Sequence, residues 1–108
     1  MSRYEKHNYS EVRLPFIFHV INNKTQAQSN WHENIEILFF TDGEGTVHIN
    51  EKDYSVKTND IIIINSNRIH SIMTSSRVSF CCAIIDRSFC LSNFIDTNLI
   101  CFKEKIFD

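Results

Sequence analysis

Short apolar stretches alternate with polar clusters along most of the chain, as far as Ile85. The polar clusters, such as TDGEG at 41–45 and TSSR at 74–77, contain the residues that favour turns. Strands of this length, with turn signals between them, are typical of a β-sandwich or a small barrel. The stretches that we predict as strands are Leu14–Ile21, Ile35–Phe40, Thr46–Ile49, Tyr54–Val56, Ile61–Ile64, Ile69–Met73 and Val78–Ile85.

The turn residues support the same all-β class, with mostly antiparallel strands. The chain has only two glycines and one proline, but eleven asparagines. Asn tolerates the left-handed backbone conformation and hydrogen-bonds to its own backbone, so it can form turns where Gly is scarce. The stretch VHINEKDYSV predicts a hairpin whose turn covers Asn50–Asp53.

The pattern changes after Ile85. Asp86 or Ser88 is a suitable N-cap for a short helix in DRSFCLSNF. The chain stops on an apolar pair at 106–107, so we expect it to continue into a further domain. The predicted sections are an N-terminal arm (1–13), a β-barrel (14–85), and a short helix with a final strand (86–108).

Composition and charge exclude several classes of protein. The net charge is −2 and no Lys/Arg cluster is present, so this part of a protein is not expected to bind DNA by itself. The apolar runs are far too short to cross a bilayer, and the polar N-terminus does not resemble a signal peptide. The four cysteines include no C-x-x-C pair, which favours reduced thiols. We expect a cytoplasmic protein.

The stretch NWHENIEILFF at 30–40 carries the candidate chemistry. If it forms one strand, Asn30, His32 and Glu36 point to the same face, which continues with Leu38 and Phe40. Polar groups followed by apolar ones on one face suggest the lining of a cavity. The opposite row, with isoleucines at 35 and 37 and Phe at 39, would then need cover from another layer or another subunit.

These residues resemble two motifs of the cupin family. His32, Glu36 and Gly43 match the second half of the first motif, and NDIIIINSNRIHSI at 59–72, which contains His70, resembles the second. The order HENIEIL, a Gly-containing turn, then IHSI is most similar to the sensor domains of AraC-type transcriptional regulators. The resemblance covers 14–102. It implies a cupin-like jelly-roll barrel that binds a small effector, supports dimerisation, and contacts DNA only through a separate helix-turn-helix domain.

The chain departs from the cupin motifs at four positions. Asn59, Asn65 and Asn67 replace Gly or Pro, which is conformationally mild where Asn adopts a positive φ. Asn30 replaces the first histidine, and an amide oxygen is a poor ligand for zinc or iron. The remaining set of one carboxylate and two histidines could still hold a metal.

We therefore expect a sensor domain that is not an enzyme and has no cofactor. Its effector is expected to be a sugar or an organic acid, with the segment before Leu14 folding over the barrel mouth. An alternative is a small metal-dependent cupin enzyme, an oxygenase or isomerase, that uses His32, Glu36 and His70. A third reading is an interaction module without pocket chemistry. The predicted ligand-binding residues are Asn30, His32, Glu36, Leu38, Phe40, His70 and Ile72.

Overall fold

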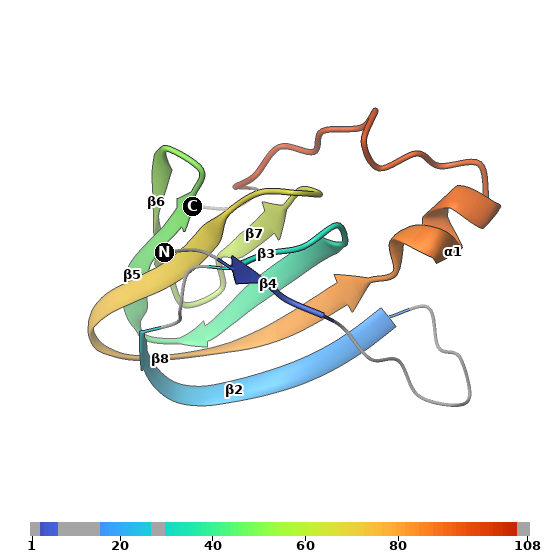
Figure 1. The fold of residues 1–108 in the computed structure, drawn as a ribbon. Helices are drawn as coiled ribbons and strands as arrows, with labels where there is room; N and C mark the ends of the chain where they lie inside the picture. The colour runs from blue at the N-terminus through green and yellow to red at the C-terminus, as the bar shows by residue number, and fades with distance from the viewer. Residues whose placement is uncertain (1–2, 7–15, 27–29, 106–108) are drawn as a thin grey trace.

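The computed structural model describes residues 3–6, 16–26 and 30–105, which form eight strands and one short helix (Figure 1). The predicted all-β class with one C-terminal helix is therefore confirmed. The helix of the described part is far too short to cross a membrane. The elements are β1 (Arg3–Tyr4), β2 (Phe16–Gln26), β3 (Asn30–Trp31), β4 (Ile35–Asp42), β5 (Glu44–Ile49), β6 (Lys52–Lys57), β7 (Ile61–Ile64), β8 (His70–Ile85) and α1 (Arg87–Ser92).

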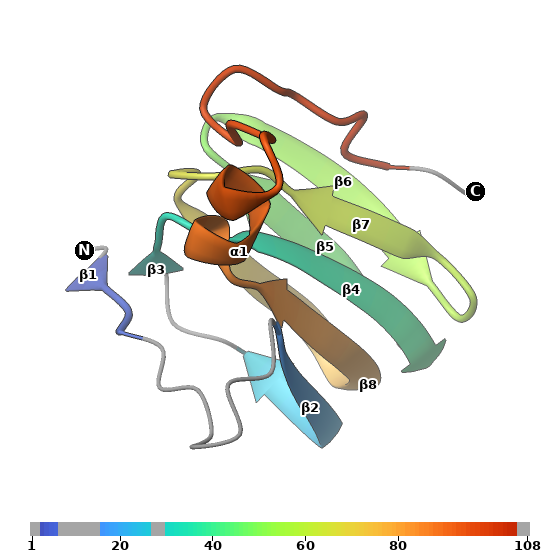
Figure 2. The same ribbon diagram turned by 90° about the vertical axis from the view of Figure 1, so that its right-hand side faces the viewer.

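The strands form two facing layers that share β8. The first residues of β8 pair with β3 and β5, while residues 78–85 pair with β2 and β4. The layers are thus β1-β3-β8-β5-β6 and β2-β8-β4-β7, and each pairing is antiparallel except that of β1 with β3. A strand that bends from one sheet into the other is a usual corner of a β-sandwich. Figures 1 and 2 show β8 curving from one layer into the other.

Several local predictions differ from the structure. In the predicted turn at 41–45 only Gly43 lies outside the strands. The predicted turn TSSR at 74–77 is wrong, because it lies inside the continuous strand β8. The predicted strand end at Ile21 is also wrong: β2 continues to Gln26 because β8 offers it backbone partners as far as Met73. The hairpin turn is shorter than expected and consists of residues 50–51, since Asp53 pairs with His48 in the ladder.

Asparagines take positive φ where glycine is usual. Asn59 has φ 78° and Asn67 has φ 63°, and Asn50 in the hairpin turn has φ 54°. The prediction that Asn replaces Gly at such positions is confirmed. Gly43, which connects β4 to β5, has φ 92°, and a Cβ at this position would lie 2.5 Å from the carbonyl oxygen of Arg77. The corner between the two layers thus requires Gly.

The core lies between the layers. On β4, Glu36, Leu38 and Phe40 are buried, whereas Phe39 is 38% exposed on the outer face. This alternation agrees with the predicted inward face of the strand. The core cluster consists of Leu38, Phe40, Val47, Ile49, Val56, Ile62, Ile64, Ile72, Val78, Phe80, Cys82 and Ile84.

The C-terminal segment returns across the barrel after α1 (Figure 2). The side chain of Asp86 caps α1 by accepting a hydrogen bond from the backbone N–H of Ser88. The segment then reaches the edge of β7, where Ile63 N–H donates to the carbonyl oxygen of Glu104 at 2.7 Å. In place of the expected final strand, the described residues contain a single bridge at Lys105. Residues 106–108, and 1–2 and 7–15 of the expected arm and its junction with the barrel, lie outside the described part.

Candidate functional site

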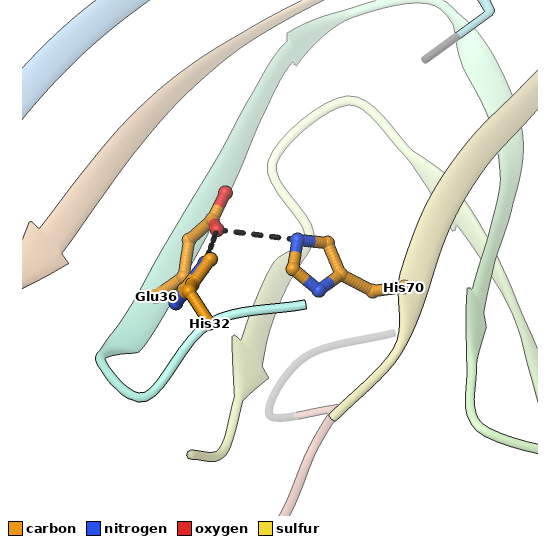
Figure 3. Close-up of side chains that lie close together, drawn as sticks. All are labelled: His32, Glu36 and His70. Carbon is orange, nitrogen blue, oxygen red and sulfur yellow. Dashed lines mark hydrogen bonds and ion pairs between the residues drawn. The ribbon is translucent and has the colours of Figure 1, made fainter. Parts of the chain in front are cut away.

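Three ionisable side chains from two separate parts of the chain meet inside the barrel (Figure 3). His32 lies between β3 and β4, Glu36 lies near the start of β4, and His70 is the first residue of β8. The Oε1 atom of Glu36 is 2.9 Å from His32 Nε2 and 3.3 Å from His70 Nε2. All three residues are buried, with exposed fractions of 1%, 8% and 9%. We call them the His–Glu–His cluster.

The backbone that positions the cluster differs from the single strand that we expected. Residues 30–40 are not one strand, because the chain turns at 32–34. The carbonyl oxygen of His32 accepts a hydrogen bond from Asn67 N–H at 2.8 Å, which ties this turn to the second motif. Asn30 still lies beside the cluster, since it pairs in register with His70. The structure thus brings together all four predicted polar residues, although the assumed strand geometry is wrong.

The hydrogen bonds define the protonation of the cluster. His70 Nδ1 is 3.1 Å from the carbonyl oxygen of Arg68, an atom that can only accept, so Nδ1 carries a hydrogen. Its Nε2 faces the carboxylate of Glu36. Because both ring nitrogens of His70 face acceptors, the imidazolium form is favoured. Glu36 Oε2 also accepts from the Cys82 thiol at 2.9 Å.

Cys82 is a member of the site that the sequence reading missed. The sequence indicates only that the four cysteines are reduced, whereas in the structure Cys82 lies on β8 and donates to Glu36. The signal is weak in the sequence, because the contact joins residues 46 positions apart. Only the register of β4 against β8 places them on the same inner face.

Burial and pairing act in opposite directions on the pKa values of the cluster. Burial raises the pKa of Glu36, but hydrogen bonds from His32 and His70 outweigh it, so the pKa lies below its usual value. Burial lowers the pKa of His70, but Glu36 outweighs it and the pKa is raised. Burial, followed by the charge of Glu36, raises the pKa of the Cys82 thiol, which therefore stays protonated. The cluster is an ion pair with a neutral thiol beside it.

This arrangement predicts a stability maximum at mildly acidic pH. The raised pKa of His70 contributes stability that is present below its unfolded value of 6.5 and is lost as pH rises through the folded pKa. The lowered pKa of Glu36 contributes stability that is present above 4.5 and is lost at lower pH. We expect a higher midpoint of thermal unfolding at about pH 6 than at about pH 8.5.

Comparison of two variants tests whether the pH dependence comes from the ion pair of His70 with Glu36. His70→Gln should flatten the difference between the two pH values, while His19→Gln, at an exposed position on β2, should leave it unchanged. Differential scanning calorimetry measures both. An unchanged pH profile in His70→Gln would contradict the ion pair.

The predicted apolar members of the site lie in the core. Leu38, Phe40 and Ile72 are 1%, 0% and 4% exposed and pack in the core cluster. Whether they contact a ligand stays a prediction. A cavity of about 870 Å³ lies elsewhere, between the β5–β6 turn and residues 101–104, and none of the seven predicted ligand-binding residues lines it.

The cluster fits a two-histidine, one-carboxylate metal site in part. The ligand atoms of His32, Glu36 and His70 all lie within 4.8 Å of one another, so modest side-chain movement could bring them onto one ion. The buried Oδ1 of Asn30 has no hydrogen-bond partner in the described part of the chain. An amide oxygen is a weak fourth donor for a transition metal.

The two-layer barrel and its buried cluster define a cupin-type protein, and comparisons agree. An RmlC-like cupin from Shewanella frigidimarina is 10% identical, with a TM-score of 0.62 over 66% of this chain and 66% of its own. A cupin protein from Bacteroides fragilis is 16% identical, with a TM-score of 0.61 over 77% and 84%. A predicted oxalate decarboxylase from Thermotoga maritima is 27% identical, with a TM-score of 0.56 over 65% and 64%.

The family model of the AraC-like ligand binding domain matches residues 17–94. The chain therefore belongs to this family, and it is a ligand-sensing domain of the cupin type. No curated protein matches it. The resemblance noted from the two sequence motifs is confirmed.

Proposed function

We propose that this domain is the sensor of an AraC-type transcription factor, that it is not an enzyme, and that it binds a small polar effector in the barrel. The observation that carries the proposal is the match of residues 17–94 to a ligand-binding family. The effector class is a sugar or an organic acid. Binding of the effector changes how the domain contacts the rest of the regulator, because a ligand acts by favouring one conformation over another.

The buried cluster supports an effector site in the barrel. Ligand sites usually combine apolar walls with a few placed polar groups. In this barrel the polar groups are Asn30, His32, Glu36 and His70, beside the apolar core. DNA contact belongs to a separate helix-turn-helix domain, since a net charge of −2 cannot neutralise a track of phosphates.

A thermal-shift screen of sugars and small organic acids tests the effector site. A compound present at about 100 times its Kd should stabilise the folded domain by about 2.7 kcal/mol. The stabilisation should shrink in Glu36→Gln and in His70→Gln, and remain in His19→Gln. If a compound stabilises all of these variants as well as the parent, its site lies away from the cluster.

Dimerisation is supported by the outer face of the β2-β8-β4-β7 layer. The register places Phe18, Ala83, Ile37 and Ile63 in one row of this face. The side chains on β2 are the most open: Phe16 is 45%, Phe18 57% and Val20 61% exposed. Ile37 belongs to the row on β4 that the sequence predicted to need cover, although Ile35 of that row is buried. We call this face of the layer the outer apolar face.

We infer that a second copy of the chain covers the outer apolar face. With about 200 Å² for a whole Phe side chain, the face exposes on the order of 500 Å² of apolar surface. Each partner of a stable dimer contributes about 800 Å². Among the described residues β2 pairs with β8 alone, so its other edge can add backbone hydrogen bonds to β2 of the second copy. Antiparallel pairing about a two-fold axis keeps both apolar rows on one face.

Phe18→Lys is expected to weaken the dimer about tenfold or more, because a central aromatic contact is replaced by a charge. Phe94→Lys is the matched control, since Phe94 is 99% exposed in the segment after α1. Sedimentation equilibrium measures both variants. A parent that stays monomeric, or a Phe18→Lys variant that dimerises like the parent, would contradict this assignment.

A metal-dependent cupin enzyme, an oxygenase or isomerase, is the second candidate. It is favoured by the convergence of His32, Glu36 and His70, which would hold the ion, and by the likeness to the predicted oxalate decarboxylase. A bound metal would supply Lewis-acid chemistry. Elemental analysis separates the two functions: about one transition metal per chain, lost in both His32→Ala and His70→Ala, supports the enzyme.

A further inference from the structure

The cavity between the β5–β6 turn and the C-terminal segment is lined by residues that do not belong to the His–Glu–His cluster. It has a volume of about 870 Å³, within the range of small-molecule sites. Its apolar walls come from Ile49, Ile69 and Phe102, with the ring of Tyr54 beside them. Ile69 is 43% and Phe102 45% exposed, so these side chains are open to a ligand.

Positive charge exceeds negative charge around this cavity. Lys52, Arg68 and Lys103 line it, against Glu51 and Glu104. None of the three cations forms an ion pair with a carboxylate within the described ranges, which contrasts with Arg87 in its pair with Asp96. The guanidinium of Arg68 makes a long contact of 3.8 Å to Cys101 Sγ. Its planar set of donors is thus available to an anion.

One of the two carboxylates is already engaged. Glu104 Oε1 accepts a hydrogen bond from the Tyr54 hydroxyl at 2.5 Å. This hydrogen bond, with burial, raises the pKa of Tyr54 to about 12, so the hydroxyl stays protonated and keeps its donor role. The contact also holds residues 101–104 against β6, which forms one wall of the cavity.

The backbone links one wall of the cavity to the His–Glu–His cluster. Ile49 is 1% exposed and pairs in register with His70. The backbone of Arg68 accepts the hydrogen bond from His70 Nδ1. A ligand held by the Arg68 side chain would therefore act on the same short segment that positions His70.

We propose that this cavity binds a small carboxylate with an apolar or aromatic body, with Arg68 holding the carboxylate and Phe102 and Ile69 contacting the body. A guanidinium binds a carboxylate through two parallel hydrogen bonds, which makes Arg the suited partner. The inference rests on the proposed function in that the domain is taken to be a sensor, but it assigns a second ligand site, lined by residues outside the predicted set.

Titration calorimetry with benzoate and octanoate, and with the uncharged benzamide and octanamide, tests the assignment. We expect at least one carboxylate to bind the parent domain, and its amide to bind about tenfold or more weakly. Arg68→Gln should lose a similar factor, and Arg68→Lys less. Arg77→Gln is the matched control, because Arg77 is an exposed arginine that does not line the cavity.

A second variant tests the same site independently, in case Arg68→Gln does not fold. Ile69→Trp, at a half-open position of the wall, fills the cavity and should abolish carboxylate binding. The inference is overturned if neither carboxylate binds the parent at about 10 mM, far above the Kd of a specific site, or if Arg68→Gln and Ile69→Trp bind as well as the parent.

The titrations and the thermal-shift screen together separate this inference from the proposed function. A sugar that stabilises the parent through Glu36, with no carboxylate binding, overturns the carboxylate site and keeps the sensor. Absence of binding by every compound class contradicts both.

Discussion

Glu36→Ala is expected to lower the free energy of unfolding by about 3–5 kcal/mol, because removing one partner of a buried pair leaves the other buried charge uncompensated. Glu36 accepts hydrogen bonds from His32, His70 and Cys82 inside the barrel. After the substitution His70 loses its counter-charge. Because His70 is only 9% exposed, water cannot easily replace the lost carboxylate. Urea unfolding followed by circular dichroism measures the change.

Two further variants serve as comparisons for Glu36→Ala. Glu36→Gln keeps the shape and one acceptor oxygen, so its cost should be smaller, about 1–3 kcal/mol. Glu51→Ala, in the exposed hairpin turn, should change stability by less than about 0.5 kcal/mol. A cost below about 1 kcal/mol for Glu36→Ala would show that the cluster does not contribute as an ion pair.

Phe40→Ala is expected to cost about 3–5 kcal/mol, as for other fully buried aromatic residues. Phe40 is 0% exposed, and its ring centroid lies 5.4 Å from that of Phe80. The substitution leaves a cavity that the close-packed layers can only partly close. The same unfolding measurement applies, with Phe94→Ala as the matched control at 99% exposure.

The Phe40 result also bears on the predicted ligand site. A side chain that only lines an open pocket loses less stability on truncation, because water can already reach the space. A cost below about 1.5 kcal/mol would therefore favour a lining role over a core role. A cost in the expected range places Phe40 in the core.

The strands could be predicted from the sequence because their signal is local. Alternating apolar positions on β4, and the apolar run of β7, report which face meets the core without knowledge of any partner. The asparagines with positive φ were predictable for the same reason, since the strain belongs to one residue. The segment at 74–77 was not, because Ser and Thr suit both a turn and a bending strand, and the pairing partners of β8 decide between them.

The site residues also divide into those that the sequence predicted and those that only the tertiary structure revealed. The sequence by itself determined the family and three members of the cluster, because His32, Glu36 and His70 stand at fixed positions in two motifs. Tertiary structure alone brought Cys82 to Glu36 and placed residues 101–104 against Arg68. These contacts join residues 46 and 33 positions apart. Strand register and the path of the C-terminal segment set such distances, and both depend on the packing of the whole chain rather than on any local pattern.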